Sequence, residues 1–270
     1  MGDPRLELDG EHVRARLLPD RGANGGYSLV VDDSTQSHVN PRDPRDLQLE
    51  YTRLVAGIVD GCREAGRPIR VLHLGGGALT LARYVSATRP GSVQHVVELH
   101  RELLEFVLDV VPLDPDVQLT FEFGDARAAV EDAVRTAGGY DLAVVDVFSG
   151  NRSPGHLSTL EFFADLGRLL ADDGIIVVNT IASAGLGAGR EVGATLAALR
   201  SDVVVMAAPE VLAGRSLGNL VFAAADVPLP TPEFLRGADT GPRRIELLSG
   251  ATFLAFVGDA TVGRDAGRLD

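Results

Sequence analysis

Apolar and polar residues alternate in two patterns between residues 69 and 224. Short runs of consecutive apolar residues are separated by longer segments in which apolar residues recur every three or four positions. The short runs are typical of strands buried in a parallel sheet, and the longer segments of the helices that cover it. The pattern therefore predicts an α/β fold with a seven-stranded sheet whose last two strands form an antiparallel pair. The expected strands are 69–75, 92–98, 117–123, 140–146, 174–180, 202–208 and 218–224, and the expected helices lie near 79–88, 100–110, 126–136, 158–170 and 187–200.

The N-terminal part of the chain has a different pattern. Residues 5–40 alternate apolar and polar side chains in short stretches, which predicts short strands or hairpins. The sequence PRDPRD then interrupts the pattern, and its last residue, Asp46, is the expected N-cap of a helix over 47–65. We therefore expect an N-terminal β-strand region over 1–45 and an α/β domain over 46–270. Beyond the expected strands, only EFLRG and IELLSGATFLAF show any pattern.

Composition and charge narrow the classes of function. The 270 residues and the hydrophobic fraction of 45% suit one large domain. The net charge of -13 argues against a nucleic-acid partner and is compatible with a cationic substrate such as a polyamine. The single cysteine, Cys62, excludes an intrachain disulfide, and no Cys/His cluster has metal-ligand spacing. Neither a signal peptide nor a membrane-spanning run is present in the sequence, so we expect a cytoplasmic protein.

Glycine and acidic residues stand at successive strand ends. The first strand of the α/β region runs into three consecutive glycines, Gly75–Gly77, where the backbone can approach a ligand closely. Glu98 ends the second strand, 21 residues after Gly77, and can accept hydrogen bonds from two ribose hydroxyls. Asp125 follows the third strand and Asp146 ends the fourth. In an open parallel sheet these ends meet in one crevice, so the order predicts a site for an adenosine-containing cofactor.

The spacing does not fit a nicotinamide dinucleotide. The pattern GxGxxG requires a glycine where this chain has Thr80, and neither Asp125 nor Asp146 belongs to that fingerprint. A nucleoside that carries a sulfonium fits better, with Asp125 and its neighbour Ala126 at the adenine amino group and Asp146 near the sulfonium. His73, inside the first strand, is either a hydrogen-bonded core residue or a base beneath the cofactor.

Several segments resemble the spermidine synthases (polyamine aminopropyltransferases), which share the S-adenosylmethionine methyltransferase fold. The resemblance covers residues 27–225, and the order and spacing of its motifs carry it. It implies a Rossmann-like sheet, S-adenosylmethionine or its decarboxylated form as co-substrate, no metal, a small-molecule amine acceptor and a homodimer. The motifs are SLVVDDSTQS, EYT, LGGG, VVELH, FGDARA, VVDVFSG and HLSTLEFFADLGRLLADDGIIVVN.

The resemblance also assigns roles to single residues. The glycine turn would wrap the amino-acid or propylamine side of the cofactor, and Asp146 would face the reacting centre. Gln36 and Tyr51 would close the site from the N-terminal side. Tyr51 and Ser149 would contact the acceptor. The residues expected to bind the cofactor are Gln36, Gly75, Gly76, Gly77, Glu98, Leu99, Asp125, Ala126 and Asp146.

The chain departs from this family at the acids that bind amines. Ala78 stands where the family has an aspartate after the glycines, and Ser149 replaces a second aspartate after the fourth strand. Thr52-Arg53 replaces His-Glu. Asp146 therefore remains as the expected proton acceptor, and His156, in the following loop, is a second candidate base. Replacement carboxylates are available on the N-terminal region at Asp32, Asp33 and Asp43.

Three functions stay open at this point. The first is transfer of an aminopropyl group to an amine. The second is methyl transfer from S-adenosylmethionine to a small molecule, which the missing acids favour. The third is a non-catalytic protein that keeps the fold.

Overall fold

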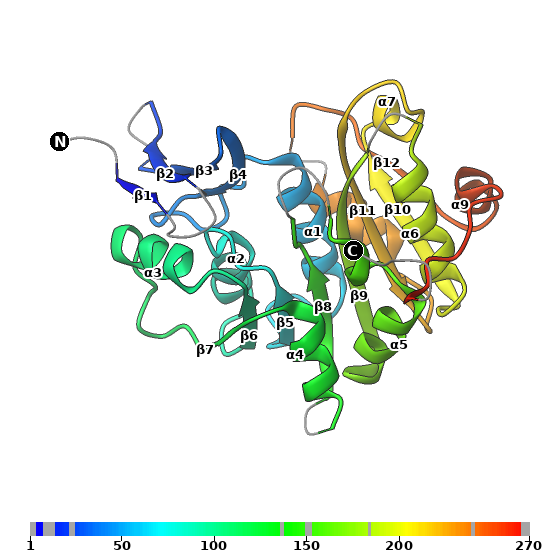
Figure 1. Ribbon diagram of the computed structural model, residues 1–270, viewed down its shortest axis with the longest axis horizontal. Coiled ribbons are helices and arrows are strands. Elements are labelled where there is room, and N and C mark those ends of the chain that lie inside the picture. Colours follow the sequence, from blue (N-terminus) through cyan, green and yellow to red (C-terminus); the bar gives the residue numbers. More distant parts are fainter. Residues whose placement is uncertain are drawn as a thin grey trace.

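Two separate sheets organise the chain (Figure 1). The computed structural model describes residues 4–7, 14–21, 25–135, 138–148, 153–182, 185–238 and 241–265. The N-terminal sheet is antiparallel, with the strand order β1-β2-β3-β4. Its last hairpin turns at Asp32 and Asp33, which both have positive φ, as a type I′ hairpin turn requires. The strands are β1 (Arg5–Glu7), β2 (Arg14–Pro19), β3 (Tyr27–Val31) and β4 (Ser34–Val39).

The second sheet has eight strands in the order β12-β10-β11-β9-β8-β5-β6-β7. The pairs from β7 to β9 are parallel, and β11, β10 and β12 add to the other edge with antiparallel pairing. The expected count of seven was wrong by one, because three-residue β12 is too short to show a periodic pattern. The strands are β5 (Arg70–Leu74), β6 (Val93–Glu98), β7 (Leu119–Phe123), β8 (Tyr140–Val145), β9 (Leu170–Ala182), β10 (Asp202–Ala207), β11 (Gly218–Ala225) and β12 (Glu246–Leu248).

Helices cover both faces of this sheet (Figure 1). Apolar side chains of α1, α2 and α8 form one core with the sheet, and those of α4, α5, α6 and α9 form another. The α3 helix packs beside β6 and also contacts the N-terminal sheet through Leu103 and Val107. The helices are α1 (Glu50–Gly61), α2 (Thr80–Thr88), α3 (Arg101–Val110), α4 (Ala126–Ala133), α5 (Leu160–Arg168), α6 (Gly187–Ala197), α7 (Pro209–Leu212), α8 (Thr231–Ala238) and α9 (Gly250–Val257), with a short 3-10 turn, η1 (Gly155–Leu157).

The first helix starts later than expected. Leu49, not Asp46, is the N-cap of α1, and it makes no side-chain capping hydrogen bond. The Asp46 carboxylate instead accepts from Asn40 Nδ2 at 2.9 Å, within the connection that follows β4. This local hydrogen bond competes with the capping role, as acidic side chains in turns often do.

A buried arginine fixes the other end of α1. The Arg89 side chain is 1% exposed, and its guanidinium donates to five backbone carbonyls between residues 59 and 67, at 2.9–3.0 Å. The donors of the guanidinium group are thereby fully used, and two carbonyls of the last turn of α1, those of Val59 and Asp60, are satisfied.

Replacing Arg89 with methionine should lower the free energy of unfolding by several kcal/mol, since each buried carbonyl left unpaired costs about 1–3 kcal/mol. We expect the melting temperature to fall by roughly 10 °C in a thermal unfolding experiment. Arg135→Met is the matched control, because the Arg135 side chain is 71% exposed and pairs with Asp132 three residues earlier. An equal fall in melting temperature in both variants would contradict the stabilising role assigned to Arg89.

Candidate active site

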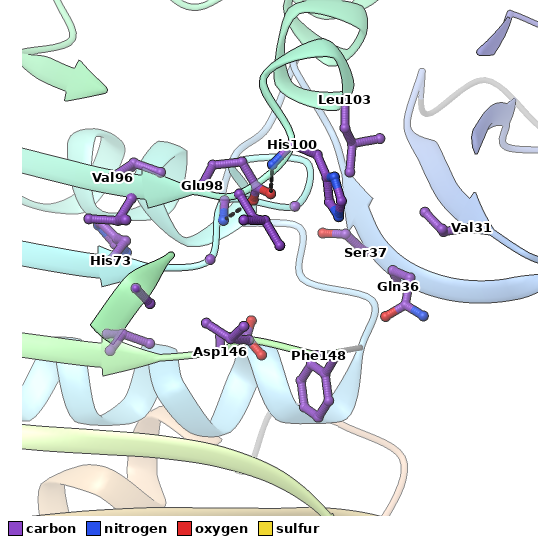
Figure 2. Close-up of a pocket in the computed structure, with 18 of the residues that line it drawn as sticks. Val31, Gln36, Ser37, His73, Val96, Glu98, His100, Leu103, Asp146 and Phe148 are labelled. Carbon is purple, nitrogen blue, oxygen red and sulfur yellow. Dashed lines mark hydrogen bonds between the residues drawn. The ribbon is translucent and has the colours of Figure 1, made fainter. Parts of the chain in front are cut away.

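A cavity of about 720 Å³ opens at the carboxyl ends of the parallel strands (Figure 2). Its floor and walls come from the segments that follow β5, β6, β7 and β8, and the β3–β4 hairpin closes it from the N-terminal side. The sequence-predicted residues Gln36, Gly75–Gly77, Glu98, Leu99, Asp125, Ala126, Asp146, Tyr51 and His156 all line it. Ser149 lies outside the described residues, so its predicted contact with substrate stays a prediction.

The glycine turn lies directly against Asp146. Gly75 has φ +93°, and a Cβ added there would lie 2.3 Å from the Asp146 backbone oxygen. Gly77 has φ +50°, also in the left-handed region that favours glycine. Backbone geometry therefore explains the glycines at positions 75 and 77. Because glycine has no side chain, the main chain of this turn is uncovered on the cavity side.

The Glu98 carboxylate bridges this turn to the start of α3 (Figure 2). One oxygen accepts from the Gly76 amide at 2.8 Å and the other from the His100 amide at 3.0 Å. The side chain is 9% exposed, so its orientation is fixed before a ligand arrives. Each oxygen retains a further lone pair that can accept from a hydroxyl. Leu99 beside it is 57% exposed, and an adenosine that occupied the cavity would cover it.

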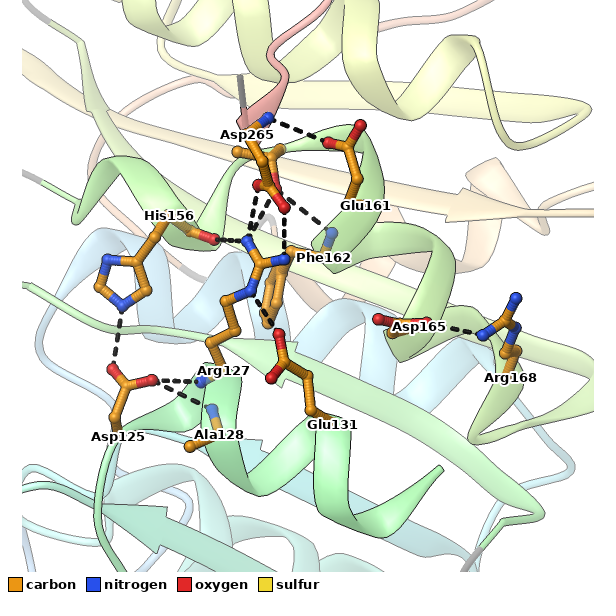
Figure 3. A network of polar contacts seen from close by, with 11 residues as sticks. Asp125, Arg127, Ala128, Glu131, His156, Glu161, Phe162, Asp165, Arg168 and Asp265 are labelled. Atoms are coloured by element: carbon orange, nitrogen blue, oxygen red, sulfur yellow. Dashed lines mark hydrogen bonds and ion pairs between the residues drawn. The ribbon is translucent and has the colours of Figure 1, made fainter. Parts of the chain in front are cut away.

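Asp125 is the N-cap of α4 and also binds His156 (Figure 3). One carboxylate oxygen accepts from the Arg127 and Ala128 amides at 3.0 and 3.1 Å, and the other lies 2.9 Å from His156 Nε2. Burial alone would raise the pKa of Asp125, but the hydrogen bonds from His156 and the two amides outweigh it and lower that pKa. The geometry therefore joins His156 to the predicted adenine end of the cavity, and its role as a base stays a prediction.

Arg127 ties this end of the cavity to the C-terminal segment (Figure 3). Its guanidinium donates to the His156 carbonyl at 3.2 Å and to both carboxylate oxygens of Asp265 at 2.7 and 2.6 Å. Asp265 in turn donates its amide to Glu161 on α5 at 3.2 Å. The role of Arg127 could not be recognised from the sequence, because the His156 carbonyl and Asp265 lie 29 and 138 residues away and no local pattern connects them to it.

Asp146 lies between α1 and β9. Its Oδ1 accepts from Asn179 Nδ2 at 2.8 Å, and the Tyr51 hydroxyl forms a second hydrogen bond to the carboxylate. Burial raises the pKa of Asp146 to about 6, although both hydrogen bonds act in the opposite direction. Burial and the Asp146 charge raise the pKa of Tyr51 well above its ordinary value, so Tyr51 stays a neutral donor. A carboxylate with this pKa is ionised at neutral pH and can accept a proton.

Hydroxyl groups attach the β3–β4 hairpin to the helix after the glycine turn. Thr80 donates to the His38 carbonyl at 2.6 Å, so its single hydroxyl proton is used and Ser37 must donate to Thr80 across 3.0 Å. Gln36 and Tyr51 meet at the same edge, where the Tyr51 hydroxyl lies 3.4 Å from the Gln36 carbonyl. Thr80, which stands where the dinucleotide pattern requires a glycine, thus holds the β3–β4 hairpin over the cavity.

Three other sequence candidates have structural explanations. His73 bonds Gln94 at 2.8 Å, and burial lowers the pKa of His73 to about 4, which makes it a neutral core residue at pH 7. The Asp33 side chain is 92% exposed and pairs with Arg16, and Asp43 accepts from the Arg45 amide in an exposed turn. Of the three replacement carboxylates, Asp32 is the one that lines the cavity.

Ala78 does not line the cavity. It is fully buried in an apolar cluster with Leu17, Leu29 and Leu103, between the glycine turn and the N-terminal sheet. A charged side chain at position 78 would have to enter that apolar cluster, where burying a charge is costly. Alanine packs against the N-terminal sheet without this cost.

A smaller cavity of about 160 Å³ adjoins the first, since Ser34, Gln36, Tyr51 and Phe148 line both. The other residues of its lining include Glu50, Asn179 and Asn219. Within the described ranges, no group of three or more His, Cys, Asp or Glu side chains is placed to hold a metal ion, and no helix is long and apolar enough to cross a membrane.

Comparison with known proteins gives polyamine aminopropyltransferases and spermidine synthases, together with methyltransferases. A polyamine aminopropyltransferase from Vibrio vulnificus is 27% identical over 145 residues, which is 54% of this chain and 48% of that protein. A probable spermidine synthase from Corynebacterium glutamicum has a solved structure with a TM-score of 0.87 and 26% identity, covering 98% of this chain and 96% of that chain. A spermidine synthase in complex with the transition state analogue AdoDATO has a TM-score of 0.63 at 16% identity, covering 88% and 79% of the two chains, which shows the fold. No family model matches the chain.

The fold and the cavity define an α/β protein of the S-adenosylmethionine methyltransferase-like class. Within that class, the resemblance to the spermidine synthase (polyamine aminopropyltransferase) family predicted from the sequence is confirmed. The chain spans about half the length of the curated relatives it matches.

Proposed function

We propose that this protein transfers an aminopropyl group from decarboxylated S-adenosylmethionine to a small amine. The donor would occupy the main cavity, with its adenine near Asp125 and Ala126, its ribose at Glu98, and its sulfonium and propylamine along the glycine turn toward Asp146. Gln36 and Tyr51 would close the site over it.

The charge of the cavity carries this choice of donor. Four carboxylates line it, those of Asp32, Glu98, Asp125 and Asp146, while the described residues of its lining include no arginine or lysine. Decarboxylated S-adenosylmethionine carries a sulfonium and an ammonium, whereas S-adenosylmethionine also carries a carboxylate. Because the described lining holds four carboxylates and no arginine, it favours the first donor and disfavours the second.

The chemistry requires a neutral amine and an aligned sulfonium. The amine nitrogen forms a bond to the propyl carbon next to sulfur, the carbon–sulfur bond breaks, and its electron pair stays on sulfur as a neutral thioether. The proton lost by the amine goes to Asp146, whose pKa of about 6 leaves it ionised at neutral pH. The sulfonium is already a good leaving group, so most of the remaining task is to position the reactants.

The acceptor would enter through the smaller cavity. Tyr51 and Phe148 form part of its wall toward the main cavity, and Asn179 connects it to Asp146. Glu50 is the acid in its described lining, and Arg243 lies 3.9 Å from the Glu50 carboxylate. An amine that extends from Asp146 into this space would meet amide and aromatic groups and one carboxylate.

Methyl transfer from S-adenosylmethionine is the second candidate. Ala78 favours it, because the acid that the family resemblance implies for gripping the propylamine ammonium is missing from this position. The cavity charge argues in the opposite direction, so the two candidates predict opposite donor preferences.

Titration calorimetry with decarboxylated S-adenosylmethionine, S-adenosylmethionine and methylthioadenosine separates them. We expect the decarboxylated form to bind at least about tenfold more tightly than S-adenosylmethionine, a difference of about 1.4 kcal/mol. A radiolabelled aminopropyl assay over a panel of amines should then give product. Tighter binding of S-adenosylmethionine would move methyl transfer ahead, and binding of none of the three would contradict both enzymatic functions.

A further inference from the structure

Three polar side chains form a chain of hydrogen bonds across neighbouring strands, beside the proposed reaction centre. Asp146 follows β8, Asn179 lies on β9 and Asn219 on β11, and these three strands are adjacent in the sheet. Asn219 Nδ2 lies 3.0 Å from Asn179 Oδ1, and Asn179 Nδ2 lies 2.8 Å from Asp146 Oδ1. Asn179 is 1% exposed, so its amide has little access to bulk solvent.

The direction of this chain follows from the carboxylate. An ionised aspartate only accepts hydrogen bonds, so Asn179 must turn its NH₂ group toward Asp146. The Asn179 oxygen then faces Asn219, which must present its own NH₂ group in turn. Asn219 therefore keeps Asn179 from rotating to the orientation in which its oxygen would face Asp146.

Both asparagines also line the smaller cavity, while Asp146 lines the main one. The chain of amides thus joins the proposed acceptor space to the proposed proton acceptor. We propose that Asn179 and Asn219 are positioning residues that keep the Asp146 carboxylate ionised and turned toward the acceptor amine. This inference rests on the proposed function, because it concerns the carboxylate that would receive the proton.

Among the other groups around Asp146, Tyr51 acts in the same direction as Asn179. Tyr51, on α1, donates a second hydrogen bond to Asp146. Glu50 in the smaller cavity is an acid with Arg243 3.9 Å away. The remaining titratable side chains of the described main-cavity lining are Asp32, His73, Glu98, His100, Asp125 and His156. The groups that favour the ionised form of Asp146 are its two hydrogen-bond donors, Asn179 and Tyr51.

The test is a direct titration of Asp146 in the protein without ligand. Carboxyl resonances of ¹³C-labelled aspartate are followed by NMR against pH, and the Asp146→Asn variant identifies the Asp146 signal. Asn179→Leu removes the donor and should raise the pKa of Asp146 by about one unit above that of the unaltered protein. Asn219→Leu frees Asn179 to rotate and should raise that pKa by a smaller amount.

Asn219→Asp gives the sharper result. A carboxylate at this position accepts from the Asn179 NH₂ group, which turns the Asn179 oxygen toward Asp146 and favours the protonated acid. The pKa of Asp146 should therefore rise more in Asn219→Asp than in Asn219→Leu. In a donor-saturated aminopropyl assay, the same variants should move the acid limb of the rate profile to higher pH by matching amounts.

Thr180→Val is the matched control. Thr180 is the neighbour of Asn179 on β9, is 3% exposed, and points to the opposite face of the strand. It should change stability without moving the Asp146 titration, and thermal unfolding checks that each variant is folded, with Asn179→Ala in reserve for Asn179→Leu. The proposal is overturned if Asn179→Leu titrates like Thr180→Val, or if both Asn219 variants titrate like the unaltered protein. The titration uses no nucleoside, so failure of the proposed function in calorimetry is a separate result.

Discussion

Replacing Asp146 with asparagine should lower aminopropyl transfer about 10²–10⁴-fold, the range typical for loss of a general base. Asparagine has nearly the same shape and its oxygen can still accept from Asn179, so the fold and the amide chain should survive. It cannot take a proton from the amine. Initial rates with saturating donor measure the effect, and calorimetry should show donor affinity retained within about tenfold, because the contacts proposed for Glu98 and Asp125 with the nucleoside would be unchanged.

The same carboxylate sets the expected pH dependence. Burial raises the pKa of Asp146 to about 6, so the rate should fall as pH drops below that value, where the acid becomes protonated. The stability effect has the opposite sign. The folded protein binds this proton more tightly than the unfolded chain, so the stabilising contribution is present below the ordinary aspartate pKa and is lost as pH rises through about 6. Asp146→Asn should therefore unfold at a higher temperature than the unaltered protein at pH 7.5, with the difference shrinking toward pH 4.

Asp32→Asn is the matched control for charge. It makes the same substitution in the same cavity, at a hairpin residue whose Oδ1 accepts from the Arg14 amide at 3.0 Å and whose φ of 47° asparagine tolerates. We expect its rate to fall less than about tenfold, since it removes charge and no proton acceptor. Equal losses in the two variants would mean that Asp146 acts only through the general negative charge of the cavity.

Residues at strand ends could be predicted from the sequence because local patterns define where strands stop. The run before Gly75 and the run before Glu98 are apolar and short, and parallel strands place their carboxyl ends together. Glu98, Asp125 and Asp146 were therefore expected in one crevice, and the structure places them in the lining of one cavity. A polar residue at a strand end is visible without knowing what it will contact.

The contacts that tune those residues could not be predicted in this way. Asn179 meets Asp146 and Asn219 only because β9 lies between β8 and β11, and that strand order reverses the chain order of β10 and β11. A polar residue inside the run GIIVVNT was the available signal, and it carries no information about partners 33 and 40 residues away. Ala78 shows a related limit. The family resemblance indicated that this position lacks the expected acid, but not that its side chain is buried against Leu17 and Leu29.

Replacing Gly75 with alanine should weaken binding of decarboxylated S-adenosylmethionine about 100-fold, equivalent to about 2.7 kcal/mol. Two effects add at this position. The backbone has φ +93°, which strains any residue with a side chain, and the new Cβ would lie 2.3 Å from the Asp146 carbonyl oxygen. Either the glycine turn or the backbone of Asp146 must therefore move. The movement would displace the turn proposed to contact the nucleoside or the acid proposed to accept the proton. Calorimetry measures the affinity, and an aminopropyl assay should show a loss at least as large.

Gly66→Ala separates strain from contact. Gly66 has φ +75°, and a Cβ added there meets nothing within 4 Å. Its alanine variant should therefore lose about 1 kcal/mol of stability through backbone strain alone, with donor affinity unchanged. If Gly75→Ala binds the donor as tightly as Gly66→Ala does, the nucleoside does not lie against the glycine turn. The proposed donor would then not fit the cavity, because the acids proposed to bind it lie around that turn.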